Sequence, residues 1–180
     1  MKKILTVVGA RPQFIKIAPV SKILRKHFKE ILVHTGQHYD ILMSEVFFNQ
    51  LNIPMPDVNL NVGSASHAKQ TSAILQGIET ILIDEKPDLV LLYGDTNSTL
   101  AAALSAVKMH IPIAHIEAGL RDIDLLQPEE VNRRITDLIS NYLFTPSLTA
   151  SENLYKENIH NGVVFVGDVM YDAIIQNLKA

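Results

Sequence analysis

The chain contains no cysteine and no tryptophan, and only 6% of its 180 residues are aromatic. Without cysteine there is no disulfide framework, no thiolate zinc site and no thiol nucleophile. The net charge of -3 and the pI near 6.1 also differ from the basic surface that general nucleic-acid binders carry. What remains is an ordinary globular composition, with 47% hydrophobic and 19% charged residues.

Long hydrophobic runs are also missing. No apolar run approaches the ~20 residues that a membrane-spanning helix needs. The N-terminus begins with two lysines and a short apolar stretch, but Arg11 and Pro12 close that stretch without a small-residue cleavage site. A first β-strand fits this pattern better than a signal peptide, so we expect a cytoplasmic protein with no membrane partner.

Short apolar runs alternate with longer helical patterns along the chain. The runs are rich in Ile, Val and Leu and do not alternate with polar residues, which is typical of strands buried on both faces of a parallel sheet. They cover residues 4–8, 31–34, 89–93, 113–116, 142–145 and 163–166, with a short edge strand expected around 58–61. The helical patterns cover residues 14–28, 39–51, 67–85, 96–109, 129–140, 147–157 and 169–178. This order predicts an α/β fold with a doubly wound, mostly parallel Rossmann-like sheet, forming one domain over residues 1–180.

Ligands of a doubly wound sheet bind beyond the carboxyl ends of its strands. The first strand is followed by Gly9 and then by a helix, whose N-terminus favours an anion. Arg11 and Lys16 would add positive charge for a pyrophosphate. The segment has neither a G-x-G-x-x-G nor a Walker A pattern, so an ordinary strand-to-helix turn stays an alternative.

Two acidic residues follow predicted strands directly. Asp95 comes after Gly94 and before a helix, where it is either a chemical group or the N-cap of that helix. Glu117 directly follows the apolar run 113–116, where a carboxylate is costly unless it is paired or functional. Its structural alternative is an ion pair with Arg121 or Arg133.

A second pair of acids, Glu129 and Glu130, opens a predicted helix after a proline. The helix dipole favours acids there whatever their function. Glu130 with Arg134, and Arg133 with Asp137, have the i, i+4 spacing of ion pairs. A solvated, salt-bridged helix face therefore stays open beside a catalytic role.

Histidine spacing does not indicate a metal site, and His115 is best explained as a strand residue whose partners surround it. The strand ends together offer carboxylates, cations and amide or hydroxyl groups. That mixture suits proton transfer on a polar substrate with an anionic handle, and it contains no hydride acceptor or electron sink.

Six segments in this order resemble the non-hydrolysing UDP-N-acetylglucosamine 2-epimerase family. They run from Lys3 to about Ile175 and are GARPQFIKIAPV, TGQHYD, KPDLVLLYGDTNSTLAAALSA, IPIAHIEAGLRD, PEEVNRRITD and VGDVMYDAI. The resemblance implies a GT-B arrangement, in which two Rossmann-like domains hold the substrate between them. It also implies interconversion of UDP-N-acetylglucosamine and UDP-N-acetylmannosamine, by elimination of UDP to a 2-acetamidoglucal and readdition. The reaction is redox-neutral, so neither a cofactor nor a metal is expected.

The resemblance also assigns roles to individual residues. The acidic catalytic positions of the family match Asp95, Glu117 and Glu129, and its phosphate-side cations match Arg11 and Lys16. The expected substrate-binding set is completed by Arg133, Gln37, His38 and Arg121. The family is about twice as long as this chain, and its second domain supplies a catalytic histidine and most of the uridine site. We therefore expect residues 1–180 to be the N-terminal domain, inactive without the C-terminal UDP-binding domain and dimeric in the full-length form.

Three alternatives remain at this point. The segment 121–128 is shorter than in some bacterial members and resembles that of enzymes of surface-glycan pathways, which favours a UDP-2,3-diacetamido-glucuronate 2-epimerase. A non-catalytic or dimerising half-domain is the second alternative, and it predicts exposed apolar surface. The acceptor domain of a glycosyltransferase with the same architecture is the third, on fold alone.

Overall fold

The computed structural model describes residues 1–37 and 53–178, which form a seven-stranded, all-parallel sheet between layers of helices. The strands lie in the order β3-β2-β1-β4-β5-β6-β7. Their bounds are Lys3–Val8 (β1), Lys29–His34 (β2), Val58–Asn59 (β3), Leu89–Tyr93 (β4), Ile113–Ile116 (β5), Tyr142–Thr145 (β6) and Val163–Phe165 (β7). The helices are Arg11–His27 (α1), His67–Glu85 (α3), Asn97–Lys108 (α4), Pro128–Ile139 (α5), Leu148–Lys156 (α6) and Val169–Leu178 (α7). The doubly wound prediction is confirmed, and the strand order reverses between β1 and β4.

The predicted elements agree with the structure except at some ends. Helix α1 begins at Arg11 instead of residue 14, because proline suits a first helical turn and the Gln13 side chain accepts hydrogen bonds from the backbone N–H groups of Gly9 and Ala10. The edge strand predicted at 58–61 is only Val58–Asn59. The helix predicted at 39–51 lies outside the described residues. Across the two described stretches, no helix is both long and apolar enough to span a membrane.

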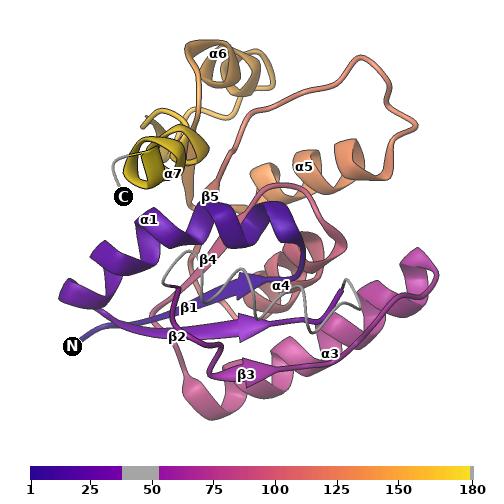
Figure 1. Cartoon of the computed structure of the whole chain (residues 1–180). Helices are drawn as coiled ribbons and strands as arrows, with labels where there is room; N and C mark the ends of the chain where they lie inside the picture. The colour runs from indigo at the N-terminus through magenta and orange to yellow at the C-terminus, as the bar shows by residue number, and fades with distance from the viewer. Residues whose placement is uncertain (38–52, 179–180) are drawn as a thin grey trace.

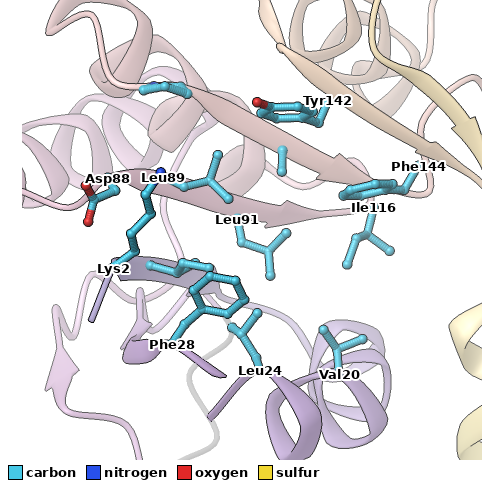
Figure 2. Close-up of a pocket in the computed structure, with 13 residues that line it drawn as sticks. Lys2, Val20, Leu24, Phe28, Asp88, Leu89, Leu91, Ile116, Tyr142 and Phe144 are labelled. Atoms are coloured by element: carbon cyan, nitrogen blue, oxygen red, sulfur yellow. The ribbon is translucent and has the colours of Figure 1, made fainter. Parts of the chain in front are cut away.

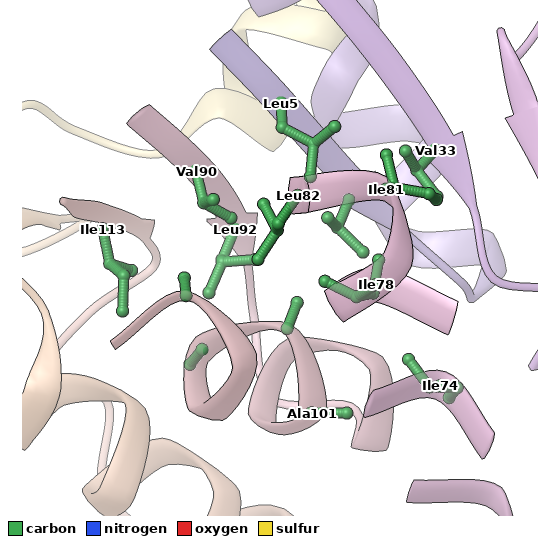
Figure 3. Packing of buried hydrophobic residues seen from close by; sticks show 14 of the residues in the cluster. Leu5, Val33, Ile74, Ile78, Ile81, Leu82, Val90, Leu92, Ala101 and Ile113 are labelled. Atoms are coloured by element: carbon green, nitrogen blue, oxygen red, sulfur yellow. The ribbon is translucent and has the colours of Figure 1, made fainter. Parts of the chain in front are cut away.

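Successive strand residues face opposite layers of the molecule. On one side, side chains from β1, β2, β4 and β5 pack against α3 and α4, as Figure 3 shows for Leu5, Val90 and Leu92 beside Leu82. The alanines of α4 let that helix lie close to the sheet, and Ala101 is fully buried. Together with α1 on the other face, these helices cover both faces of each central strand, which explains the continuous apolar runs in the sequence.

The other face of the sheet is covered by α1, with α7 beside it (Figure 1). Between α1 and strands β4 to β6 lies an apolar pocket of about 450 Å³, into which Val20 and Leu24 of α1 point, together with Phe28 directly after the helix (Figure 2). Lys2 and Asp88 lie at its end beside the amino ends of β1 and β4. The pocket therefore runs along the strands from their amino ends to Ile116 at the carboxyl end of β5, and its lining is apolar there.

Candidate functional site

The carboxyl ends of β1, β4 and β5 meet beside the N-termini of α1, α4 and α5 (Figure 1). Because β1 and β4 are neighbours and β4 pairs with β5, the turns that follow them are adjacent. These turns carry Arg11 at the start of α1, Gly94 and Asp95 after β4, and Glu117 after β5. The edge predicted from the sequence is thus one continuous surface.

Glu117 forms an ion pair with Lys16 of α1, not with the expected Arg121 or Arg133. Strand alternation would point Glu117 to the same side of the sheet as His115, toward α5. The backbone of Glu117 is instead left-handed, with φ of +72°, and its side chain meets α1 on the other side. The side chains of Lys16 and Glu117 are only 10% and 15% exposed, so the pair is shielded from solvent but still reachable from the edge.

Gly94 lies directly beside this ion pair. Its φ is +63°, a conformation that glycine adopts without strain. A Cβ atom at this position would lie 3.2 Å from Oε2 of Glu117 and 3.6 Å from Nζ of Lys16. The glycine therefore gives the turn its shape and leaves room for the two charged groups.

Asp95, the next residue, forms an ion pair with Arg133 of α5, with 2.5 Å between Oδ2 and Nη2. It does not cap α4: the N-cap is Thr96, whose side chain accepts a hydrogen bond from the backbone N–H of Thr99. Burial alone would lower the pKa of the Arg133 guanidinium, but Asp95 and Glu130 raise it above its ordinary value. The Asp95 side chain keeps 29% exposure, so the carboxylate is oriented and remains accessible.

Glu129 and Glu130 have different environments, although both open α5. Glu129 is exposed and lines a polar pocket of about 310 Å³ together with Asp95. Glu130 is 1% exposed and accepts hydrogen bonds from Arg133, Arg134 and the backbone N–H of Asp122. The solvated-face interpretation is therefore wrong for Glu130, although its predicted pair with Arg134 is present.

The polar pocket is lined by residues from several elements. Its members are Gln37, Ser64, Ala65, His67, Gln70, Asp95, Thr96, Asn97, Glu129 and Asn132. The amide oxygen of Gln37 already has partners within the chain, because it accepts hydrogen bonds from the backbone N–H and the hydroxyl of Ser98. The pocket brings together Gln37, Asp95 and Glu129 of the expected site.

The remaining predicted residues lie in different surroundings. Arg11 is exposed in the first turn of α1. Arg121 is in a buried ion-pair network with Asp137 and Glu157, and this network replaces the predicted pair between Arg133 and Asp137. His38 lies outside the described residues.

Two site residues were missed by the sequence reasoning. The Gln13 amide donates hydrogen bonds to the Tyr93 carbonyl at 2.6 Å and to the Thr99 hydroxyl at 3.1 Å, besides capping its own helix. Asn132 donates to the Asp95 carbonyl at 2.8 Å and is 4% exposed. A glutamine at the third helical position and an asparagine inside a helix are the signals that could have found them.

This arrangement suits acid–base chemistry. Three carboxylates lie at one edge, two of them oriented by cations, and a helix N-terminus with a nearby arginine can hold an anion. Within residues 1–37 and 53–178, no three His, Asp or Glu side chains are grouped so that they could hold a metal ion. The carboxylates and cations of the edge are groups that can exchange protons with a bound anionic substrate.

Known proteins similar to this chain share one family description. The model of the family "UDP-N-acetylglucosamine 2-epimerase" matches residues 22–180. A UDP-N-acetylglucosamine 2-epimerase homolog of Methanococcus maripaludis is 61% identical over 98% of this chain and 50% of its own length. The UDP-2,3-diacetamido-2,3-dideoxy-D-glucuronate 2-epimerase of Pseudomonas aeruginosa is 52% identical over 96% of this chain and 50% of its own length.

Solved structures agree with these relatives. The UDP-GlcNAc 2-epimerase of Methanocaldococcus jannaschii, solved in complex with UDP-GlcNAc and UDP, superposes with a TM-score of 0.95 and 47% identity. The match covers 98% of this chain and 49% of that structure. The chain thus spans about half the length of the relatives it matches. On this evidence the chain belongs to the UDP-N-acetylglucosamine 2-epimerase family.

Proposed function

We propose that this chain is the N-terminal half of an enzyme that interconverts UDP-N-acetylglucosamine and UDP-N-acetylmannosamine. The observation that carries the proposal is the set of carboxylates at the carboxyl edge, Asp95, Glu117 and Glu129, beside the cations Lys16 and Arg133. Family membership and the substrate complex of the M. jannaschii relative support the choice of substrate.

The proposed reaction proceeds by elimination and readdition. The bond from C1 of the sugar to the UDP oxygen breaks, and UDP leaves with the electron pair. A carboxylate of the edge takes the proton from C2, which gives the neutral 2-acetamidoglucal. In the second step a proton returns to the opposite face of C2 while UDP adds back to C1. Carboxylates stabilise the positive charge that develops at C1, which also acidifies the C2 proton.

The cations have separate roles in this proposal. Arg11 in the first turn of α1 and Lys16 in the next turn hold the pyrophosphate of UDP. Arg133 orients Asp95 through their ion pair. Gln37 and Arg121 act through the groups they already bind, Ser98 and Asp137. We also propose that His38 contacts the substrate, as the family resemblance implies.

Turnover in D₂O tests the proposed chemistry. We expect the protein that joins this chain to a C-terminal half to incorporate solvent deuterium at C2 of the product sugar. Asp95→Asn, Glu117→Gln and Glu129→Gln should each lower kcat by about a hundredfold or more, as removal of a general acid or base does. Glu79→Gln, which changes an exposed acid on α3, is the matched control and should leave kcat unchanged. Product formed without deuterium at C2 would contradict the proposed route.

The half-site is a separate part of the proposal. The chain spans half of its relatives, so we expect residues 1–180 alone to bind UDP-sugars weakly and to turn over none of them. The measurement is a coupled assay for UDP-N-acetylmannosamine with the 180-residue chain, and the longer protein is the control. Robust turnover by the short chain would overturn this expectation. We place the enzyme in the cytoplasm, and cell fractionation would check that placement.

A UDP-2,3-diacetamido-glucuronate 2-epimerase is the second candidate, supported by the 52% identity with the P. aeruginosa enzyme. Both reactions use the same bond changes at C1 and C2. They differ in the acetamido group at C3 and the carboxylate at C5 of the sugar. Comparing kcat/KM for the two sugar nucleotides would distinguish them, and a strong preference for the uronate would displace the leading proposal.

Dimerisation is the third element of the proposal. Apolar side chains of β7, of the residue after it and of α7 are 46% to 77% exposed, namely Val164, Phe165, Val166, Tyr171, Ile174 and Leu178. Exposed apolar side chains of this kind are typical of a protein–protein contact, with a C-terminal domain or with another copy. Light scattering of this chain is the test, and a clean monomer at high concentration would count against self-association through these side chains.

A further inference from the structure

His115 is fully buried in β5, and the acid–base proposal does not use it. Its Nδ1 lies 2.7 Å from Oδ1 of Asp137, and its Nε2 lies 2.7 Å from the carbonyl oxygen of Gly94. A backbone carbonyl can only accept a hydrogen bond. Nε2 must therefore be the donor to Gly94.

The surroundings of Asp137 keep it ionised. Its Oδ2 accepts hydrogen bonds from the backbone N–H of Gly119 at 3.0 Å and from Nη1 of Arg121 at 2.7 Å. Burial alone would raise the pKa of the Asp137 carboxyl, but the hydrogen bonds from His115 and Arg121 lower it below its ordinary value. Asp137 thus holds the ring in the orientation that aims Nε2 at the Gly94 carbonyl.

The pair belongs to a closed series of hydrogen-bonded and ion-paired side chains. The neighbouring pairs are His115–Asp137, Asp137–Arg121, Arg121–Glu157, Glu157–Arg134, Arg134–Glu130, Glu130–Arg133 and Arg133–Asp95. Asp95 follows Gly94 in the chain, and the Gly94 carbonyl accepts the hydrogen bond from His115. The series therefore returns to its starting point through one peptide group.

We propose that His115 is the positioning residue of the site: it holds the Gly94 carbonyl and so fixes Asp95 relative to Glu117. Gly94 lies between the two carboxylates, against the Glu117 side chain and directly before Asp95. Rotation of the Gly94–Asp95 peptide would move Asp95 away from Arg133. The hydrogen bond from His115 opposes that rotation at the one atom it touches. The kinetic consequence of this positioning rests on the proposed epimerase function, whereas the hydrogen bond to Gly94 does not.

The hydrogen on Nε2 can be detected on the 180-residue chain itself. NMR of the chain labelled with ¹⁵N in its seven histidines separates a ring nitrogen that carries a hydrogen from one that does not, because their shifts differ widely. We expect the shift of a nitrogen that carries a hydrogen for Nε2 of His115, assigned by the loss of that signal in His115→Gln. An Nε2 without a hydrogen would overturn the proposal without any reference to enzymatic activity.

Two variants separate positioning from packing. His115→Gln keeps a donor that can reach the Gly94 carbonyl, whereas His115→Met keeps a similar volume and has no donor. In the protein that includes the C-terminal half, His115→Met should lower kcat by about ten- to a hundredfold with little change in KM, as small misplacements of catalytic groups do. His115→Gln should retain more of the kcat. Equal loss in both variants, or a better kcat for His115→Met, would show a packing role and overturn the positioning.

A further NMR readout distinguishes failure of this inference from failure of the proposed function. The ¹³C shift of the Gly94 carbonyl and the ¹⁵N shift of Asp95 belong to the peptide group that His115 contacts. We expect both to change in His115→Met more than in His115→Gln. Even if the wild-type protein showed no epimerase turnover, these shifts would show whether His115 holds the Gly94 carbonyl. Unchanged shifts in a folded His115→Met variant would overturn it.

Discussion

Replacing Lys16 by methionine would keep most of the side chain's volume while removing the ammonium group that Glu117 faces. The two side chains are 10% and 15% exposed, so water can reach the unpaired carboxylate only in part. Removing one partner of a fully buried ion pair costs about 3–5 kcal/mol. Because this pair keeps some exposure, we expect Lys16→Met to lower the free energy of unfolding by about 2–3 kcal/mol.

A double-mutant cycle isolates the interaction between the two groups. Glu117→Gln and the double variant complete the cycle, and urea unfolding of the 180-residue chain by circular dichroism gives the four free energies. We expect a coupling of about 1–3 kcal/mol between Lys16 and Glu117. The control is Lys3 with Glu85, an ion pair of 2.9 Å whose side chains are 25% and 38% exposed, which should couple much more weakly. A coupling at the site no larger than that of the control would refute the reasoning.

Three further predictions concern the turns of the site and the stability of the fold at acidic pH. Thr96→Ala removes the N-cap of α4 and should lower the melting temperature by about 2–4 °C, corresponding to about 1 kcal/mol, in a thermal scan. Gly94→Ala should destabilise the chain more than Gly167→Ala in urea unfolding, because both have positive φ but only the Cβ at Gly94 would meet other atoms within 4 Å; equal losses would contradict this. The hydrogen bond from Arg121 lowers the pKa of Glu157 in the folded chain. Ionised Glu157 therefore stabilises the fold fully above the ordinary pKa range of a carboxyl, and this stabilisation is lost as the pH falls below about 4. Glu157→Gln should therefore lose less stability than the parent chain between about pH 5 and pH 3, and parallel pH profiles would contradict it.

The arrangement of strands and helices follows from local patterns in the sequence. Parallel strands buried on both faces appear as continuous apolar runs, and each run here forms a strand of the sheet. Pro87 ends α3 after Lys86 adopts a left-handed conformation, as a proline at that place predicts. These features depend on neighbours within a few residues, so a single sequence can reveal them.

The pairing of charges at the site could not be derived in the same way. Glu117 was expected beside Arg121 or Arg133, but its left-handed backbone turns it to the other side of the sheet, toward Lys16. Lys16 and Glu117 are 101 residues apart in the chain, and only the neighbouring positions of β1, β4 and β5 bring them together. Backbone conformation at a single turn decides such a contact, and residue type alone does not determine it.

The hydrogen bonds of Gln13 have a consequence for how this edge responds to a ligand. One amide side chain connects the turn before α1 with the carbonyl of Tyr93 and with the first turn of α4. The two turns therefore cannot open independently, because moving either one would leave buried donors and acceptors without partners. Both turns are therefore ordered before a ligand binds. The entropy cost of ordering them is part of the free energy of folding and does not reduce the affinity for the ligand. A change that a ligand induces at this edge would then move the two turns together, with each turn keeping its shape.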